Sequence, residues 1–240
     1  MNRLLFFIFI FLAPLFSFSQ PIDGATGLMK IPSADMQKDG TFIVGGNYLP
    51  DAVTPNKSFN YNTGNYFFNL TFLPFMEFTY RSTLLSWNGN HNQDRSFGLR
   101  LRLIKESKLI PSLVIGGNDL YTTGQELDIT SQGTGNRFFN STFVVATKHL
   151  DVAANRVGFT VGISNGGVRN QNLNGVFGGI SFAPACLPTL RLMAEYDAEV
   201  VSTGADILLW KHLYVFGMAY DLKRFAGGLS YRFYLKKQAH

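Results

Sequence analysis

Two acidic residues, Glu195 and Asp197, are separated by one position in a segment that alternates apolar and polar residues. A β-strand would therefore place both carboxylates on the same face. Carboxylate pairs about 5–10 Å apart carry out the acid and base chemistry of glycosidases. The chain also has arginines at alternating positions of other segments, and ion pairing with them is a simpler role. We therefore expect the two acids to form ion pairs rather than to hydrolyse a substrate.

His91 is the histidine best placed for catalysis, because it lies in a predicted loop with Asp94 and Ser96 nearby. A nucleophile, a base and an orienting group within hydrogen-bond reach would give a barrel enzyme acting on lipid or peptide. The chain has no His-Glu-x-x-His motif and no Walker loop. Asp119, Glu126 and Asp128 lack the spacing of a calcium loop. We expect no enzymatic activity, metal or cofactor, and keep the barrel enzyme as an alternative.

The N-terminus has the features of an export signal. Arg3 precedes an apolar run of 13 residues that ends at Phe16, and small serines come before Gln20. A helix needs about 20 residues to span a bilayer, so this run is too short for a membrane anchor. We predict that residues 1–19 are a cleaved signal peptide.

The composition favours a membrane protein over a soluble enzyme. Charged residues make up 15% of the chain, against about 25% in a typical soluble protein, and aromatic residues also make up 15%. The net charge of +5 comes from scattered lysines and arginines. Because there is no basic block, we expect no nucleic acid partner.

Apolar and polar residues alternate through most of the chain after the signal. The stretches from Met76 to Leu84 and from Phe97 to Leu103 are clear examples. Successive strand side chains point to opposite faces, so one face is apolar and the other polar. We predict an all-β, antiparallel, up-and-down transmembrane barrel whose apolar face meets lipid. The twelve predicted strands lie near 41–48, 60–72, 76–85, 96–105, 110–118, 137–148, 156–164, 175–183, 189–198, 203–210, 213–221 and 226–235.

Short turns and longer polar connections mostly alternate. Tight turns at Leu73-Pro74 and around Lys211 contrast with predicted loops at 50–59, 86–95, 121–136 and 165–174. The link at 149–155 is long for an inner turn. Bacterial barrels have short periplasmic turns and longer outer loops, so twelve strands place both termini on the periplasmic side. The predicted organisation is a signal peptide (1–19), a lead-in or periplasmic plug segment (20–40), a barrel (41–235) and a polar tail (236–240).

The alternation also assigns each side chain to a face. A slip of one residue would drive arginines into hydrocarbon at roughly 2–4 kcal/mol each, which fixes the register. The residues predicted to face outward are Phe78, Tyr80, Leu99, Leu101, Leu113, Ile115, Phe143, Val145, Phe159, Val161, Ile180, Phe182, Leu190, Leu192, Val215, Leu229, Tyr231 and Phe233. Those predicted to face the lumen are Glu77, Arg81, Arg100, Arg102, Asn140, Thr142, Thr160, Arg191, Glu195, Asp206, Ser230 and Arg232.

A secreted, soluble β-sandwich that binds carbohydrate is the other fold compatible with alternating strands. It would carry fewer aromatic residues at the strand ends and more charge on one face. The barrel is therefore the preferred interpretation.

Three short segments carry a family resemblance. They run from Gly24 to Ala34 (with Asp39-Gly40 opening the first strand), from Pro111 to Asp119, and from Ala194 to Asp197. In this order and spacing they resemble the YjbH family of outer-membrane proteins, which are encoded with exopolysaccharide and capsule genes. The chain resembles the N-terminal barrel portion of family members that are several times longer. The motif residues here are Gly24, Gly27, Leu28, Pro32, Gly40, Pro111, Gly116, Asp119, Glu195, Tyr196 and Asp197.

The resemblance implies a location in the bacterial outer membrane and a role in exopolysaccharide or capsule production or export. We expect a non-enzymatic barrel that acts as a polar conduit or as a docking component. Its expected partners are outer-membrane lipid, an anionic polysaccharide and periplasmic exopolysaccharide-export proteins. In a conduit, the inward arginines at 81, 100, 102, 191 and 232 would favour anionic sugar chains.

Overall fold

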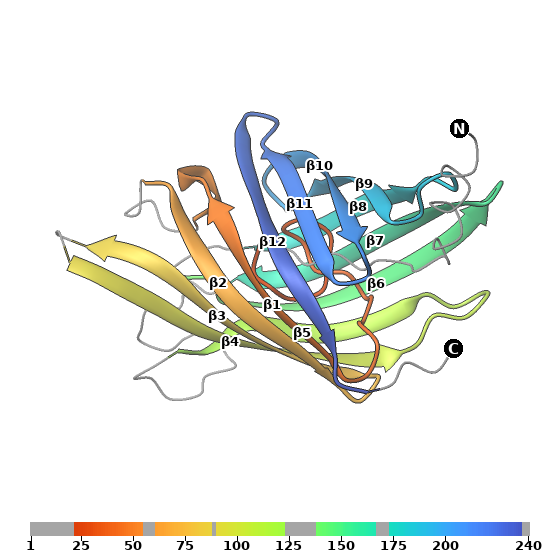
Figure 1. The fold of residues 1–240 in the computed structure, drawn as a ribbon, viewed down its shortest axis with the longest axis horizontal. Helices are drawn as coiled ribbons and strands as arrows, with labels where there is room; N and C mark the ends of the chain where they lie inside the picture. The colour runs from red at the N-terminus through yellow and green to blue at the C-terminus, as the bar shows by residue number, and fades with distance from the viewer. Residues whose placement is uncertain (1–21, 55–60, 88–89, 123–137, 167–172, 237–240) are drawn as a thin grey trace, which may run out of the picture.

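The computed structural model describes residues 22–54, 61–87, 90–122, 138–166 and 173–236. Within them, twelve strands form one closed antiparallel sheet (Figure 1). No helix of the described residues is long and apolar enough to cross a membrane. The elements are β1 (Thr41–Leu49), the short 3-10 helix η2 (Asp51–Val53), β2 (Thr63–Phe72), β3 (Met76–Trp87), β4 (Asn90–Ile104), β5 (Ser112–Thr122), β6 (Ser141–Val152), β7 (Asn155–Gly166), β8 (Gly175–Ala183), β9 (Leu190–Tyr196), β10 (Val201–Leu209), β11 (Leu213–Tyr220) and β12 (Arg224–Tyr234).

Each strand pairs with its neighbours in sequence, and β1 pairs with β12 to close the ring. The prediction of an all-β, up-and-down barrel of about twelve strands is therefore confirmed. The alternative of two stacked sheets is wrong, because a single ladder runs round the barrel and leaves no second layer. The predicted signal peptide at 1–19 lies outside the described residues, as does most of the polar tail.

Two predicted connections are strands instead. Residues 86–95 were expected to form a loop, but β3 continues to Trp87 and β4 begins at Asn90. At the other end, the long link expected at 149–155 is a tight turn of Ala153 and Ala154 between β6 and β7. Backbone pairing satisfies N–H and C=O groups whatever the side chains are, so polar side chains do not end a strand.

The facing of β6 also differs from the prediction. Phe143 and Val145 were expected outside but are 4% and 0% exposed inside the barrel, while Thr142 takes the outward position. Four consecutive apolar residues at 143–146 make the alternation ambiguous. The deciding factor is an apolar patch inside the barrel, to which Phe143 and Val145 belong.

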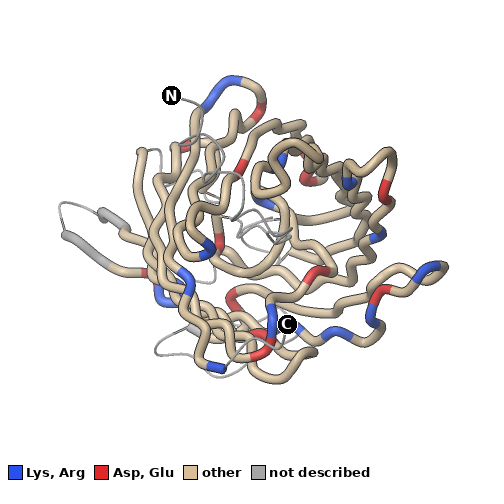
Figure 2. Tube along the Cα trace, turned by 45° about the vertical axis from the view of Figure 1, so that its right-hand side comes forward, with Lys and Arg blue, Asp and Glu red and all other residues tan. Residues whose placement is uncertain are grey.

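The outer face is apolar and carries a row of aromatic side chains. Their ring centroids are 6.2 Å apart for Phe42 and Phe68, 4.8 Å for Phe68 and Tyr80, and 5.1 Å for Tyr80 and Phe97. On the other side Phe42 meets Phe233 at 6.1 Å. The row thus crosses β12, β1, β2, β3 and β4. In Figure 2 most of the trace is tan, and the charged residues are short blue and red stretches, several of them at hairpin ends.

Residues 22–40, which we call the lumenal segment, fold inside the ring of strands (Figures 1 and 2). Leu28, Met29 and Ile31 are 2%, 0% and 0% exposed. They belong to one buried apolar cluster with inward residues of the wall such as Phe143 and Phe177. The apolar patch on the wall therefore has a partner within the barrel.

Candidate functional site

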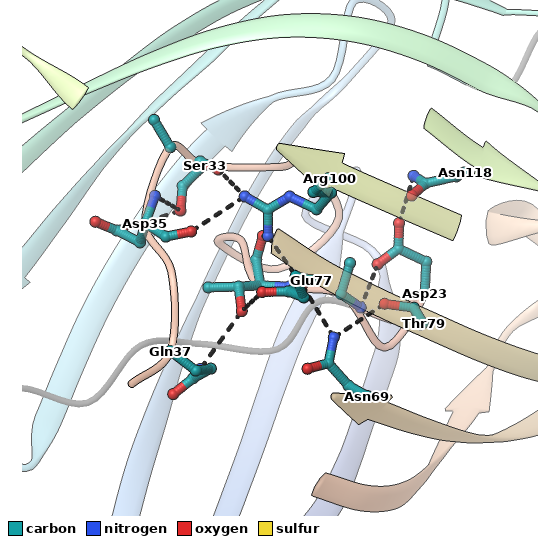
Figure 3. Close-up of polar contacts among 12 residues, drawn as sticks. Asp23, Ser33, Asp35, Gln37, Asn69, Glu77, Thr79, Arg100 and Asn118 are labelled. Atoms are coloured by element: carbon teal, nitrogen blue, oxygen red, sulfur yellow. Dashed lines mark hydrogen bonds and ion pairs between the residues drawn. The ribbon is translucent and has the colours of Figure 1, made fainter. Parts of the chain in front are cut away.

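Glu77 and Arg100 form a buried ion pair that binds the lumenal segment to β3 and β4 (Figure 3). Their Oε1 and Nη1 atoms are 3.1 Å apart, and the side chains are 0% and 1% exposed. The carboxylate accepts hydrogen bonds from the N–H and the hydroxyl of Thr26, at 2.7 and 2.6 Å. The guanidinium donates to the carbonyl oxygens of Thr26, Ser33 and Asp35. Both members of the pair thus hold backbone groups of the segment.

Glu195 holds the segment from the opposite wall, on β9. Its carboxylate accepts hydrogen bonds from the backbone N–H groups of Met29 and Lys30 at 2.9 and 2.8 Å, and from that of Ile31 at 3.5 Å. These three residues lie between Gly27 and Pro32, which form a backbone bridge. One carboxylate therefore satisfies the N–H groups of a whole turn inside the barrel.

Lys30 extends this second anchor. Its Nζ lies 2.5 Å from Oδ2 of Asp197 and donates to the hydroxyl of Tyr220 at 3.1 Å. Burial alone would lower the pKa of Lys30, but the charge of Asp197 outweighs it and the pKa rises to about 12. Burial also opposes ionisation of Asp197, yet the lysine charge holds the pKa of that carboxyl below its ordinary value. The pair is therefore fully charged near neutral pH.

Further contacts run the length of the segment. The carbonyl of Ile22 accepts hydrogen bonds from the amides of Asn47 and Asn65, at 3.0 and 2.6 Å. Asn118 donates to the carboxylate of Asp23 at 2.6 Å. Near the other end, the N–H of Ala34 donates to the Thr147 hydroxyl at 2.8 Å. The segment is therefore bonded to strands on all sides of the barrel.

The space above the segment is also filled. Buried Leu49, Val53, Phe139 and Leu173 close over Ile22. The pocket among these residues has a volume of about 10 Å³, which is roughly the room that one water molecule requires. Together with the anchors below, these contacts leave no wide passage among the described residues.

The remaining predicted lumen residues meet protein groups. Arg191 is paired with Asp206, with Nη2 and Oδ2 2.6 Å apart. The guanidinium of Arg81 lies 3.9 Å from the ring centre of Phe139, and that of Arg232 lies 5.3 Å from Tyr214. Arg102 differs from the prediction: it is half-buried at the rim and donates to the carbonyl of Pro74. The expected row of inward arginines is therefore not a row of free cations.

The first and third family-like motifs meet in the lumen. Leu28 and Pro32 lie in the lumenal segment, which binds Glu195 and Asp197 through Lys30 and its neighbours. Gly24 has a φ of +83°, and a Cβ there would lie 2.5 Å from the Phe67 ring, so the position requires glycine. Tyr196, between the two acids, points outward and is 44% exposed.

The second motif, Pro111 to Asp119, covers the start and most of β5. Two of its polar side chains, Ser112 and Asn118, bond to the lumenal segment. Asp119 has a φ of +51° and its carboxylate accepts a hydrogen bond from the N–H of Phe139 at 3.2 Å. No sequence signal foretold that these three motifs share one bonded network, because their contacts join residues up to 167 positions apart.

The candidate catalytic residues all fall on β4. His91 belongs to β4 rather than to a loop, and Asp94 and Ser96 are buried on the inward face of that strand. The sequence analysis overlooked one Gly-x-Ser-x-Gly pattern, at Gly162 to Gly166. It lies inside β7, not at a strand-to-helix turn, and the Ser164 hydroxyl donates to the carbonyl of Thr142 at 3.0 Å.

Comparison with known proteins gives one family. The model of the YjbH family, described as exopolysaccharide biosynthesis protein YbjH, matches residues 19–175. No curated protein matches the chain. Among solved structures, the crystal structure of the Acinetobacter baumannii outer membrane protein Omp33 is similar, with 10% sequence identity and a TM-score of 0.44. That alignment covers 82% of this chain and 98% of the other.

Proposed function

Because this chain belongs to the YjbH family of exopolysaccharide biosynthesis proteins, we propose that it is a non-enzymatic barrel of the outer membrane that serves exopolysaccharide or capsule production. Within that role we propose a docking component rather than an open conduit for sugar chains. The observation that carries this choice is the lumenal segment, which is bound to β3 and β4 on one side and to β9 on the other.

The outer surface supports the membrane location. Large apolar side chains stand exposed round the barrel, including Val161 at 60%, Phe159 at 45% and Phe78 at 44%. In water, such a surface would be a large aggregation-prone patch. In a bilayer, a closed barrel satisfies its backbone groups internally and turns this same surface to the acyl chains.

Energetics support the closed lumen. Displacing the segment would break the Lys30–Asp197 ion pair and would remove the backbone donors that Glu195 accepts from Met29 and Lys30. Breaking one buried ion pair typically costs about 3–5 kcal/mol. A total of about 5 kcal/mol already leaves roughly one molecule in several thousand open. A conduit that opened spontaneously would need weaker anchors than these.

Conductance across planar bilayers tests the choice between docking and conduit. We expect the wild-type protein to show no steady current. The double variant Glu77→Gln and Glu195→Gln removes both carboxylate anchors and should produce channel openings. A milder variant, Lys30→Met with Asp197→Asn, serves if the first fails to fold. A large steady conductance in the wild type would contradict the docking proposal and support the conduit.

The link to exopolysaccharide is tested in the source cell. Deletion of the gene should lower the amount of surface polysaccharide, and wild-type protein should restore it. Cross-linking in intact cells should then join the protein to periplasmic export components, at the end of the barrel where short turns connect the strands. Normal polysaccharide in the deletion strain would contradict the proposed role, whatever the conductance result.

A further inference from the structure

Two pockets of opposite character meet at Lys148, at the end of the barrel where short turns join the strands. The first has a volume of about 490 Å³ and lies between the β4–β5 connection and the β6–β7 hairpin. The second, about 460 Å³, lies on the outer face of β6, β7 and β8. Lys148 lines both, so the two pockets adjoin at its side chain.

The first pocket is polar and carries an excess of positive charge. Five cationic side chains and three carboxylates line it, leaving two positive charges before His149 is counted. They are Arg102, Lys105, Lys108, Lys148 and Arg156, with Asp35, Glu106 and Asp151. An excess of positive charge suits a phosphate group, which lysine and arginine bind through charge-assisted hydrogen bonds.

The cations of this pocket are not equally available. Lys148 lies 3.1 Å from Glu106, whose other oxygen is 2.7 Å from Nδ1 of His149. Arg102 is held by the carbonyl of Pro74. Lys105 and Lys108 are exposed and have no ion pair within the described part of the chain. The uncompensated charge therefore sits on the β4–β5 connection, at the rim.

The second pocket is apolar and faces away from the lumen. Ala146, Phe159, Val161 and Ile180 line it, and the last three are 45%, 60% and 49% exposed. Ala146 is the small outward residue of β6 that leaves the depression between larger neighbours. Leu109 and Ile110, at the tip of the β4–β5 connection next to Lys108, are 90% and 53% exposed, and the following residue, Pro111, lines the apolar pocket. Lysines beside exposed apolar side chains are typical of a membrane interface.

We propose that this place binds one anionic phospholipid, with its phosphate between Lys105 and Lys108 at the polar pocket and an acyl chain in the apolar pocket along β6 and β7. The inference rests on the proposed membrane location. A soluble sugar or a free anion would use the polar pocket alone. A lipid in the leaflet next to the short turns would use both pockets, with its head group at the end of the barrel and its acyl chain along the outer face.

Native mass spectrometry of the detergent-solubilised full chain tests the site. Short-chain phosphatidylglycerol, short-chain phosphatidylcholine and glycerol phosphate are each titrated against the protein. We expect phosphatidylglycerol to bind about tenfold more tightly than phosphatidylcholine. The double variant Lys105→Gln and Lys108→Gln should remove this preference. Ala146→Phe, which fills the apolar pocket, should weaken both lipids.

Matched controls lie elsewhere on the barrel. Lys223→Gln changes an exposed lysine at the opposite end, and Ala205→Phe enlarges an outward alanine of β10; neither should alter lipid binding. Equal binding of both lipids, or glycerol phosphate binding as tightly as phosphatidylglycerol, would overturn the proposal. If the protein fails to insert into lipid vesicles at all, the membrane location is wrong. If it inserts without any lipid preference, the lipid site alone is wrong.

Discussion

Glu195 uses its carboxylate to accept hydrogen bonds from three backbone N–H groups of the lumenal segment, and Glu77 accepts one from the N–H of Thr26. A buried backbone donor without a partner is costly, and the segment has no ladder of its own apart from the Gly27–Pro32 bridge. A charged acceptor on the wall solves this problem better than a neutral one, because charge-assisted hydrogen bonds are about twice as strong. The lumen charges are therefore part of how the segment folds.

Replacing Glu195 by glutamine should destabilise the protein by about 1–3 kcal/mol, because the amide NH₂ would face the N–H groups of Met29 and Lys30. The measurement is the denaturant midpoint of the folded protein in detergent. Glu199→Gln is the control, since Glu199 is exposed three residues beyond the end of β9. Equal midpoints for the two variants would show that Glu195 does not hold the segment.

The Lys30–Asp197 pair predicts how the segment responds to pH. Because the pKa of Asp197 is lowered in the folded state, its contribution to stability is present above its ordinary value of 3.8 and is lost as the pH falls through the lowered value. The pKa of Lys30 is raised to about 12 in the folded state. Its contribution to stability is therefore complete below the ordinary value of 10.5 and is lost as the pH rises through about 12. Between these limits the contribution of this pair to stability should not change with pH.

Hydrogen exchange of residues 27–32, followed from neutral pH to below pH 3.8, measures this response. We expect wild-type exchange, corrected for its intrinsic pH dependence, to rise in acid. In Asp197→Asn it should already be raised at neutral pH and change less with acid. A wild-type profile parallel to that of the variant would mean that the ion pair does not hold the segment.

At the scale of elements, the sequence sufficed for strand number and order but not for the contents of the barrel. Alternation is a local property, so each of the twelve strands could be located from it. The error at Phe143 and Val145 has a non-local cause: these residues face Leu28 and its neighbours, more than a hundred positions away in sequence. Likewise Glu195 and Asp197 were expected to pair with wall arginines, yet they bind the lumenal segment.

The β6–β7 hairpin gives a prediction about turn geometry. Ala153 and Ala154 have φ values of +47° and +67°, which alanine adopts poorly and which suit a type I′ turn. Replacing them by asparagine and glycine should stabilise the protein by about 1 kcal/mol. The thermal midpoint of the folded barrel checks this. The same pair introduced at Pro184-Ala185, where φ is not positive, should give no gain, and a gain at both places would point to an effect on the unfolded chain.

At the scale of the whole molecule, the barrel differs from a soluble protein because many charged side chains are buried inside it and large apolar side chains are exposed on its outer face. Ionised side chains and the lumenal segment fill the centre, while valines, leucines and aromatic residues form the surface. The same surface would bring soluble copies together, so the solvent around the strands decides whether the fold is stable. An arginine placed on this surface is a direct probe of that solvent.

Val161 and Val152 are matched sites for such a probe, because both are outward valines of the same hairpin, 60% and 56% exposed. Val161 lies midway along β7, and Val152 lies at the hairpin tip. In a bilayer, Val161→Arg should destabilise the folded barrel by roughly 2–4 kcal/mol, whereas Val152→Arg should change stability by about 1 kcal/mol or less, because the cost of arginine depends on depth. Reversible unfolding from lipid vesicles measures both. Equal small effects would mean that water surrounds the middle of the strands, and the membrane location would then fail together with the lipid site.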